Sequence, residues 1–148
     1  MNEPKSSWIV KASDSTMPWG KELSWNNNSN SSVKTLFLNK GKSSSFKYNK
    51  IKDELLICAS GKIKVYYGSE EIITKNFGDL KSDYLKPGIA LSVQSGCPYR
   101  LEAIEDSVIL EISSGRDNDP VRLYDDYGRN INFKSTHLDR IIKKWFQN

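Results

Sequence analysis

The chain has 148 residues and a mass of 16.9 kDa, which is typical of one domain with its own hydrophobic core. It contains 22 Lys and Arg against 18 Asp and Glu, two cysteines and a single histidine. No apolar run reaches the roughly 18 residues that a membrane-spanning helix needs, and two cysteines are too few for a disulfide framework. A site built from several histidines is excluded because His137 stands alone.

The net charge of +4 is small, and acidic residues are interleaved with the lysines along the chain. Nucleic-acid-binding domains concentrate basic residues in a stripe with interspersed aromatic side chains, and this sequence lacks such a stripe. The first residues also lack an apolar segment of signal-peptide length. We therefore expect a cytoplasmic protein that binds neither nucleic acid nor a membrane.

The composition of residues 1–32 predicts an irregular N-terminal arm. This segment contains Pro4, Pro18 and Gly20 and ends in a run of Asn and Ser over residues 26–32, which is typical of surface loops. It also holds three of the four tryptophans. Because such large aromatic side chains are seldom left in water, we expect the arm to pack on the body of the domain or on a partner.

Residues 33–134 have a different pattern, in which short apolar runs alternate with turn signals. This pattern predicts an all-β barrel or sandwich, and no helical periodicity of useful length interrupts it. The predicted strands cover 33–38, 45–48, 55–59, 63–67, 71–74, 83–85, 90–93, 100–104 and 107–113. The stretch 114–134 is polar and rich in turn residues, so we expect loops there.

Residues 135–148 predict a short amphipathic helix that completes a single domain spanning 1–148. Thr136, followed three residues later by Asp139, fits an N-terminal capping pattern. We expect the apolar face of the helix to dock on the sheet of its own chain, and a second subunit is the alternative. That face consists of Leu138, Ile141, Ile142, Trp145 and Phe146.

Four stretches, taken in order, resemble the cupin family: Met17–Gly20, Gly41–Gly61, Gly88–Tyr99 and Val121–Arg129. The last of them, with its Val-Arg-Leu-Tyr-Asp-Asp-Tyr-Gly-Arg sequence, is the most family-specific. More narrowly, the chain is similar to small cupins related to the C-terminal domain of type II phosphomannose isomerase (mannose-6-phosphate isomerase). The resemblance implies a double-stranded β-helix, or jelly roll.

The cupin resemblance also implies a divalent metal held inside the barrel by three histidines and one glutamate. In this sequence Lys47, Asn49 and Tyr99 stand at the three histidine positions, and only Glu54 matches. A charged lysine has three hydrogen-bond donors and no lone pair, so it repels a metal. We therefore expect that the metal has been lost, that no other cofactor is bound, and that these four residues line a pocket for a small polar ligand.

Two arrangements of Lys47 are open at this point. In one, Lys47 forms an ion pair with Glu54 and supplies the positive charge in place of the metal, so that removing either partner would strand a buried charge. In the other, Lys47 extends to the mouth of the barrel and has no role.

Arg122 and Arg129 also have two interpretations. Their guanidinium groups suit bidentate recognition of a phosphate. Alternatively, each could pair with Asp125 or Asp126 and hold the loop in place.

Three functions from different classes fit these residues. The first is a binding module for a sugar, sugar phosphate or nucleotide sugar in carbohydrate metabolism or polysaccharide biosynthesis. The second, implied by the resemblance, is an active sugar-phosphate isomerase or a nucleotide-sugar epimerase or ketoisomerase, with Lys47 or Tyr99 exchanging protons in place of the histidines. The third is a structural or dimerisation protein. We expect a homodimer, and the sequence does not identify catalytic residues.

Overall fold

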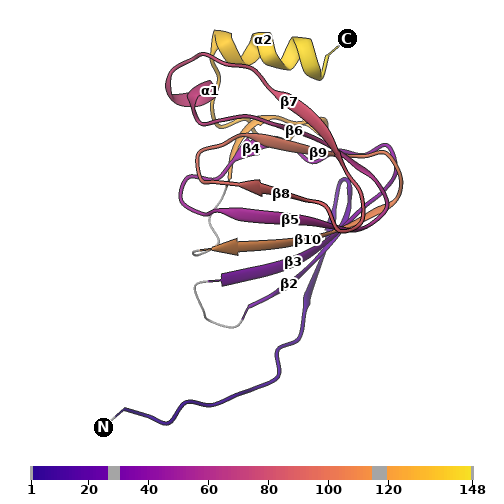
Figure 1. Ribbon diagram of the computed structural model, residues 1–148, viewed down its shortest axis with the longest axis vertical. Helices are drawn as coiled ribbons and strands as arrows, with labels where there is room; N and C mark the ends of the chain where they lie inside the picture. Colours follow the sequence, from indigo (N-terminus) through magenta and orange to yellow (C-terminus); the bar gives the residue numbers. More distant parts are fainter. Residues whose placement is uncertain (1, 27–30, 115–119, 148) are drawn as a thin grey trace.

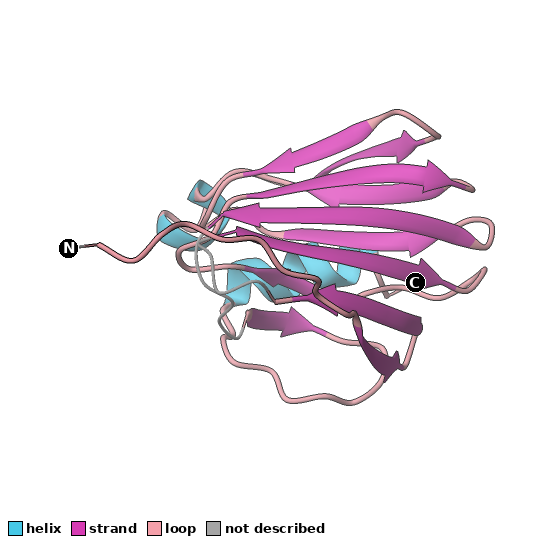
Figure 2. Cartoon of the chain, turned by 90° about the horizontal axis from the view of Figure 1, so that it is seen from below, coloured by secondary structure: helices cyan, strands magenta, loops and turns pink. Residues whose placement is uncertain are grey.

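Two antiparallel sheets pack face to face in the computed structural model, which describes residues 2–26, 31–114 and 120–147 (Figures 1 and 2). The six-stranded sheet has the order β1 (Ser13–Met17), β2 (Gly20–Trp25), β3 (Ser31–Leu38), β10 (Ser107–Ser114), β5 (Glu54–Ser60) and β8 (Ala90–Val93). The five-stranded sheet has the order β11 (Val121–Tyr124), β4 (Phe46–Tyr48), β9 (Tyr99–Ala103), β6 (Ile63–Tyr67) and β7 (Lys81–Leu85). The predicted all-β jelly roll is confirmed.

The core lies between the two sheets because successive side chains of a strand point to opposite faces. On β5, Leu56 and Cys58 point inward and are buried, whereas the alternate residues Leu55 and Ile57 point outward. Leu101 on β9 and Ile109 on β10 complete the central contacts from either side. The predicted strand positions are therefore correct over most of the barrel.

The prediction of an irregular arm over 1–32 is wrong for residues 13–25, which form the β1–β2 hairpin. Gly20 explains the turn: its φ is +152°, and a Cβ there would lie 1.8 Å from the carbonyl oxygen of Phe37. Trp19, inside the turn, is buried in the core. The Met-Pro-Trp-Gly sequence thus anchors the hairpin on β3, although its proline and glycine had indicated a loop.

Residues 2–12 have no regular secondary structure, and the N-terminal end of the chain extends away from the barrel (Figure 1). Trp8 is 63% exposed and Ile9 is 91% exposed. Packing of the arm on its own body is thus observed for Trp19 and not for Trp8. Of the polar run 26–32, residues 27–30 lie outside the described part of the chain, and residues 31 and 32 belong to β3.

Two further elements differ from the prediction. Residues 71–74, predicted as a strand, form the single-turn helix α1 (Glu71–Thr74), which buries Ile72 against the body of the domain. One turn of helix is sufficient here because the element buries a single side chain, that of Ile72. Within the predicted loop 114–134, residues 121–124 form β11 and pair with β4.

The C-terminal helix α2 (Thr136–Trp145) packs on the outer face of the five-stranded sheet of its own chain, as expected (Figure 1). Leu138 and Ile141 meet Phe46 and Leu123 there. The helix is capped by Ser135, whose hydroxyl accepts a hydrogen bond from the amide of Leu138, and not by Thr136. Within the described residues, no helix is long and apolar enough to cross a membrane.

Candidate functional site

A cavity of about 180 Å³ lies inside the barrel and is lined by side chains from both sheets. All six residues singled out from the sequence line it: Lys47, Asn49, Glu54, Tyr99, Arg122 and Arg129. Four charged residues that were not singled out, Glu22, Lys34, Lys52 and Glu111, join them. The cavity occupies the position that the family pattern implies for the metal.

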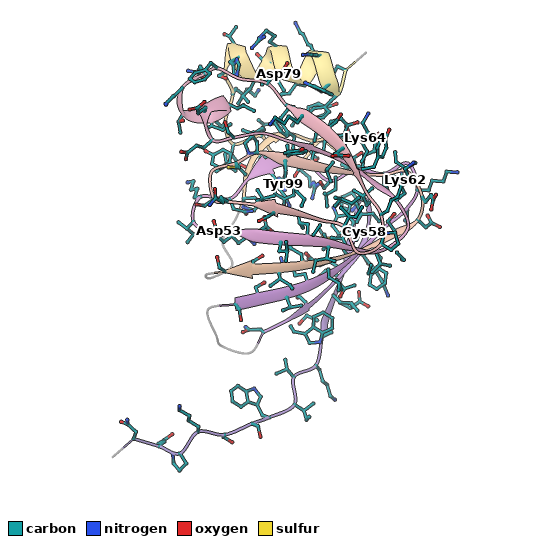
Figure 3. The ribbon with its side chains drawn as sticks, viewed as in Figure 1. Asp53, Cys58, Lys62, Lys64, Asp79 and Tyr99 are labelled. Atoms are coloured by element: carbon teal, nitrogen blue, oxygen red, sulfur yellow. The ribbon has the colours of Figure 1, made fainter. Side chains whose placement is uncertain are left out.

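The strand registers explain why these side chains converge. Lys47 on β4 lies directly opposite Tyr99 on β9 and, on its other side, opposite Arg122 on β11. Glu54 begins β5 on the facing sheet, beside Ser113 of β10. Tyr99 is buried between the sheets (Figure 3). Both sheets thus contribute polar groups to a single enclosed space.

Glu54 is the centre of the hydrogen-bond network. Its Oε1 accepts a short hydrogen bond from Asn49 Nδ2 and one of 2.8 Å from the hydroxyl of Tyr99. Its Oε2 lies 3.5 Å from Ser113 Oγ, which donates a long hydrogen bond. Two of the residues at family histidine positions therefore donate to the one glutamate that matches the pattern.

Glu111 forms a carboxyl pair with Glu54 at the base of the cavity. Burial, together with the neighbouring negative charge of Glu54, raises the pKa of Glu111 to about 7, although Lys47 and Lys34 act in the opposite direction. A hydrogen bond between the two side chains adds to the upward shift. Because two buried carboxylates cannot both ionise easily at close range, Glu111 releases its proton only as the pH approaches about 7.

Lys47 adopts neither of the two arrangements that the sequence left open. Among the described residues it makes no ion pair with Glu54, and its ammonium nitrogen lies 6.0 Å from the ring centroid of Tyr99. The side chain is partly accessible because it faces the cavity. Burial within the barrel lowers the pKa of Lys47, and the charges of Glu111 and Glu54 only partly offset this effect. Lys47 is therefore an amine directed at the cavity.

The loop-fixing interpretation holds for Arg129, whose Nε and Nη2 both donate to the carboxylate of Asp125, the shortest of these hydrogen bonds being 2.8 Å. Burial alone would raise the pKa of Asp125, but the hydrogen bonds from Arg129 outweigh it and lower that pKa. Asp126 pairs instead with Arg100, beneath α2. Arg122 donates to the carbonyl oxygen of Asn130 over 3.3 Å. Both Arg122 and Arg129 still line the cavity.

Comparison of the sequence with protein-family models finds no match, and comparison with curated proteins finds none either. Solved structures do match. KdgF from Halomonas sp. has a TM-score of 0.59 and 14% identity over 76% of this chain and 90% of its own. The oxalate decarboxylase of Lactobacillus farciminis, solved as a formate complex, has a TM-score of 0.66 and 16% identity over 80% of this chain and 36% of its own.

A third structure is CapF from Staphylococcus aureus, described as a capsular polysaccharide assembling protein. Its TM-score is 0.61, with 13% identity over 76% of this chain and 30% of its own. This chain has the cupin fold. It spans only about a third of the decarboxylase and of CapF, and at these identities the likeness shows the fold and not the activity.

The cavity of this barrel does not fit the divalent metal that the cupin resemblance implies. The described residues contain no group of three or more His, Cys, Asp or Glu able to hold a metal ion. Asn49 and Tyr99 direct hydrogens at Glu54 and thereby occupy one of its oxygens. The amine of Lys47 faces the same space, and transition metals favour imidazole or thiolate ligands over such a set.

Glu111 and Lys34 were missed in the sequence, although a signal was present. Each stands at an inward position of its strand, Glu111 two residues after the buried Ile109 and Lys34 two residues before the buried Leu36. The two lie opposite each other in the β3–β10 register. A charged residue at a strand position that points into the barrel is thus the signal that could have identified both residues.

Metal analysis tests whether the residues around Glu54 bind a metal ion. Protein purified without chelators should contain far less than stoichiometric zinc, iron or manganese by plasma mass spectrometry, because the groups around Glu54 satisfy one another. Addition of each metal should leave the unfolding temperature unchanged, since only a ligand of the native state stabilises it. A stoichiometric metal that is lost in a Glu54→Gln variant would contradict this assignment.

The carboxyl pair predicts an unusual dependence of stability on pH. Between the ordinary pKa of 4.5 and the value of about 7 in the fold, the native state keeps a proton on Glu111 that the unfolded chain loses. The free energy of unfolding should therefore fall as pH rises through this window, by about 3 kcal/mol for a shift of this size.

A Glu111→Gln variant should flatten this pH dependence, because the amide keeps a hydrogen-bond donor toward Glu54 and has no proton to lose. Urea unfolding at pH 5 and pH 8 measures the slope. The exposed Glu105→Gln variant is the control and should retain the wild-type slope. Equal slopes in the wild type and in Glu111→Gln would show that the pair does not share a proton.

Proposed function

We propose that this protein is a metal-free cupin that binds a small anionic carbohydrate, such as a sugar phosphate or the charged part of a nucleotide sugar, in the barrel. The observation that carries the proposal is the charge of the cavity. Five Lys or Arg side chains and three Glu side chains line it within the described part of the chain. Because the pKa of Glu111 is raised to about 7, the positive excess is larger still below this pH.

The positive charges are distributed so that an anion can approach them. Glu22 pairs with Lys34 over 3.3 Å, at the side of the cavity formed by β2 and β3. Arg122 and Arg129 belong to the opposite sheet and the loop that follows it. Arginine recognises phosphate in a planar, bidentate manner. Because Asp125 already holds the guanidinium of Arg129, Arg122 is the arginine that we assign to the anionic group on this side of the cavity.

The remaining walls suit a sugar ring. Trp19 and Leu36 offer an apolar surface to ring carbons, while Ser45, Asn49 and the carboxyl pair offer hydrogen-bond partners for hydroxyl groups. An engineered cavity of about 150 Å³ holds benzene, so a cavity of about 180 Å³ admits one monosaccharide-sized group. The rest of a nucleotide sugar would extend beyond it.

The structural comparisons support carbohydrate chemistry only as an analogy. CapF is described as a capsular polysaccharide assembling protein, and the sequence resemblance to phosphomannose isomerase points to the same class of ligand. A place in carbohydrate metabolism or polysaccharide biosynthesis is therefore part of the proposal, as is descent from an isomerase of this type.

Titration calorimetry with mannose 6-phosphate and with mannose tests the role of charge. We expect the phosphate ester to bind more tightly than the neutral sugar, because the cavity carries an excess of positive charge. A Lys47→Met variant, close to Lys in length, should weaken binding about tenfold, or about 1.4 kcal/mol. Lys75→Met, at an exposed lysine outside the cavity, should have no effect. Equal affinity for both sugars would overturn the proposal.

We also propose the homodimer, through the outer face of the six-stranded sheet. Val33, Leu55, Leu110 and Ile112 are all at least one-third exposed there. Ile112 lies opposite Val33 on one side and Leu55 on the other, so the apolar surface continues across three strands. A continuous apolar patch of this kind is typical of an interface, and a second copy presents the same patch to itself under two-fold symmetry.

Light scattering tests the dimer. The wild type should have twice the mass of the chain, and Ile112→Lys should give the monomer mass because it introduces two charges at the symmetric contact. Ile51→Lys, at an exposed isoleucine in the loop between β4 and β5, should remain dimeric. A monomeric wild type at micromolar concentration would refute this interface.

A further inference from the structure

Lys47 and the carboxyl pair form a combination that simple anion binding does not need. The lysine faces the cavity and makes no ion pair within the described residues. In the carboxyl pair beside it, Glu111 exchanges its proton close to neutral pH, because its pKa is raised to about 7. A nucleophile, a proton donor and a proton acceptor thus share one enclosed space.

We propose that Lys47 captures the carbonyl group of an open-chain sugar or sugar phosphate as a Schiff base, with the Glu54–Glu111 pair transferring the protons. This inference rests on the proposed function, because the carbonyl compound enters the same cavity. It goes beyond that function by assigning covalent chemistry to one residue.

The reaction balances without an oxidant or a reductant. The lone pair of the Lys47 amine forms the C–N bond, the carbonyl π electrons move to oxygen, and the proton released from nitrogen reaches that oxygen through the carboxyl pair. The protonated carboxyl then donates a proton to the carbinolamine hydroxyl, which leaves as water while the C=N bond forms. Hydrolysis reverses each step and regenerates the free amine.

The surroundings of Lys47 favour this chemistry. Attack requires the neutral amine, and burial shifts the lysine toward that form. Each unit by which the pKa of a lysine falls raises its neutral fraction about tenfold near neutral pH. Trp19 and Leu36 in the cavity wall restrict water around the imine. Exposed lysines of this chain lack these conditions.

The positions of the strands define the ligand more closely. Lys47 lies directly opposite Arg122 in the β4–β11 register, and paired strands are about 4.8 Å apart. A phosphate at Arg122 therefore lies within a few bonds of a carbonyl at Lys47. Short phosphorylated aldehydes and ketones meet this spacing, so glyceraldehyde 3-phosphate is a suitable probe.

Reductive trapping tests the proposal. The full chain is incubated with glyceraldehyde 3-phosphate and borohydride, and the adducts are located by peptide mass spectrometry. We expect the secondary amine to form at Lys47 at least about tenfold faster than at exposed lysines, because burial lowers the pKa of Lys47 and so favours its neutral form. Lys75→Arg should keep this adduct, and Lys47→Arg should lose it. Glu111→Gln should slow its formation.

The outcomes separate this inference from the proposed function. Binding of sn-glycerol 3-phosphate, which has no carbonyl group, is measured on the same protein by calorimetry. If sn-glycerol 3-phosphate binds, but glyceraldehyde 3-phosphate forms an adduct at Lys47 no faster than at exposed lysines, carbonyl capture is wrong and the binding function stands. If Lys47 is trapped but sn-glycerol 3-phosphate neither binds nor protects, capture stands and anion binding is wrong. The wild-type peptide map decides the question even if Lys47→Arg does not fold.

Discussion

The buried carboxylate of Glu54 is the constraint on which the interior of this barrel depends. An ionised carboxyl group removed from water is costly unless hydrogen bonds or a positive charge compensate it. Here Asn49 and Tyr99 donate to one oxygen, Ser113 donates to the other, and a hydrogen bond links Glu54 to Glu111. Two of the residues at the implied histidine positions thus donate to the glutamate.

The inward alternation of the strands was predictable from the sequence, whereas the meeting of Lys47 with Tyr99 was expected from the cupin resemblance and is observed. Periodicity correctly placed the apolar face of α2 on the sheet. It failed for α1, because a four-residue apolar run is compatible with either a strand or one turn of helix. It also failed for β11, which lies within a polar stretch rich in turn residues. It also failed at Gly20, whose role depends on the carbonyl of Phe37 across the sheet.

The partner of each charged group was not predictable, because it depends on distances between elements remote in the chain. Lys47 and Glu54 are close in sequence and carry opposite charges, which favoured a direct ion pair. Glu111, 57 residues further along the chain than Glu54, contacts it instead and supplies a proton. Similarly, Asp125 and Asp126 are adjacent, yet one pairs with Arg129 in the loop and the other with Arg100 beneath α2.

The raised pKa of Glu111 affects the charge that surrounds Lys47. If both carboxyl groups were ionised, they would favour the charged ammonium form of the lysine, since opposite charges favour the charged form. Below about pH 7 Glu111 is largely neutral, and hydrogen bonds from Asn49 and Tyr99 already reach Glu54. The lysine is then not required to neutralise the glutamates. Its amine remains directed at the cavity, where an incoming ligand supplies the missing partner.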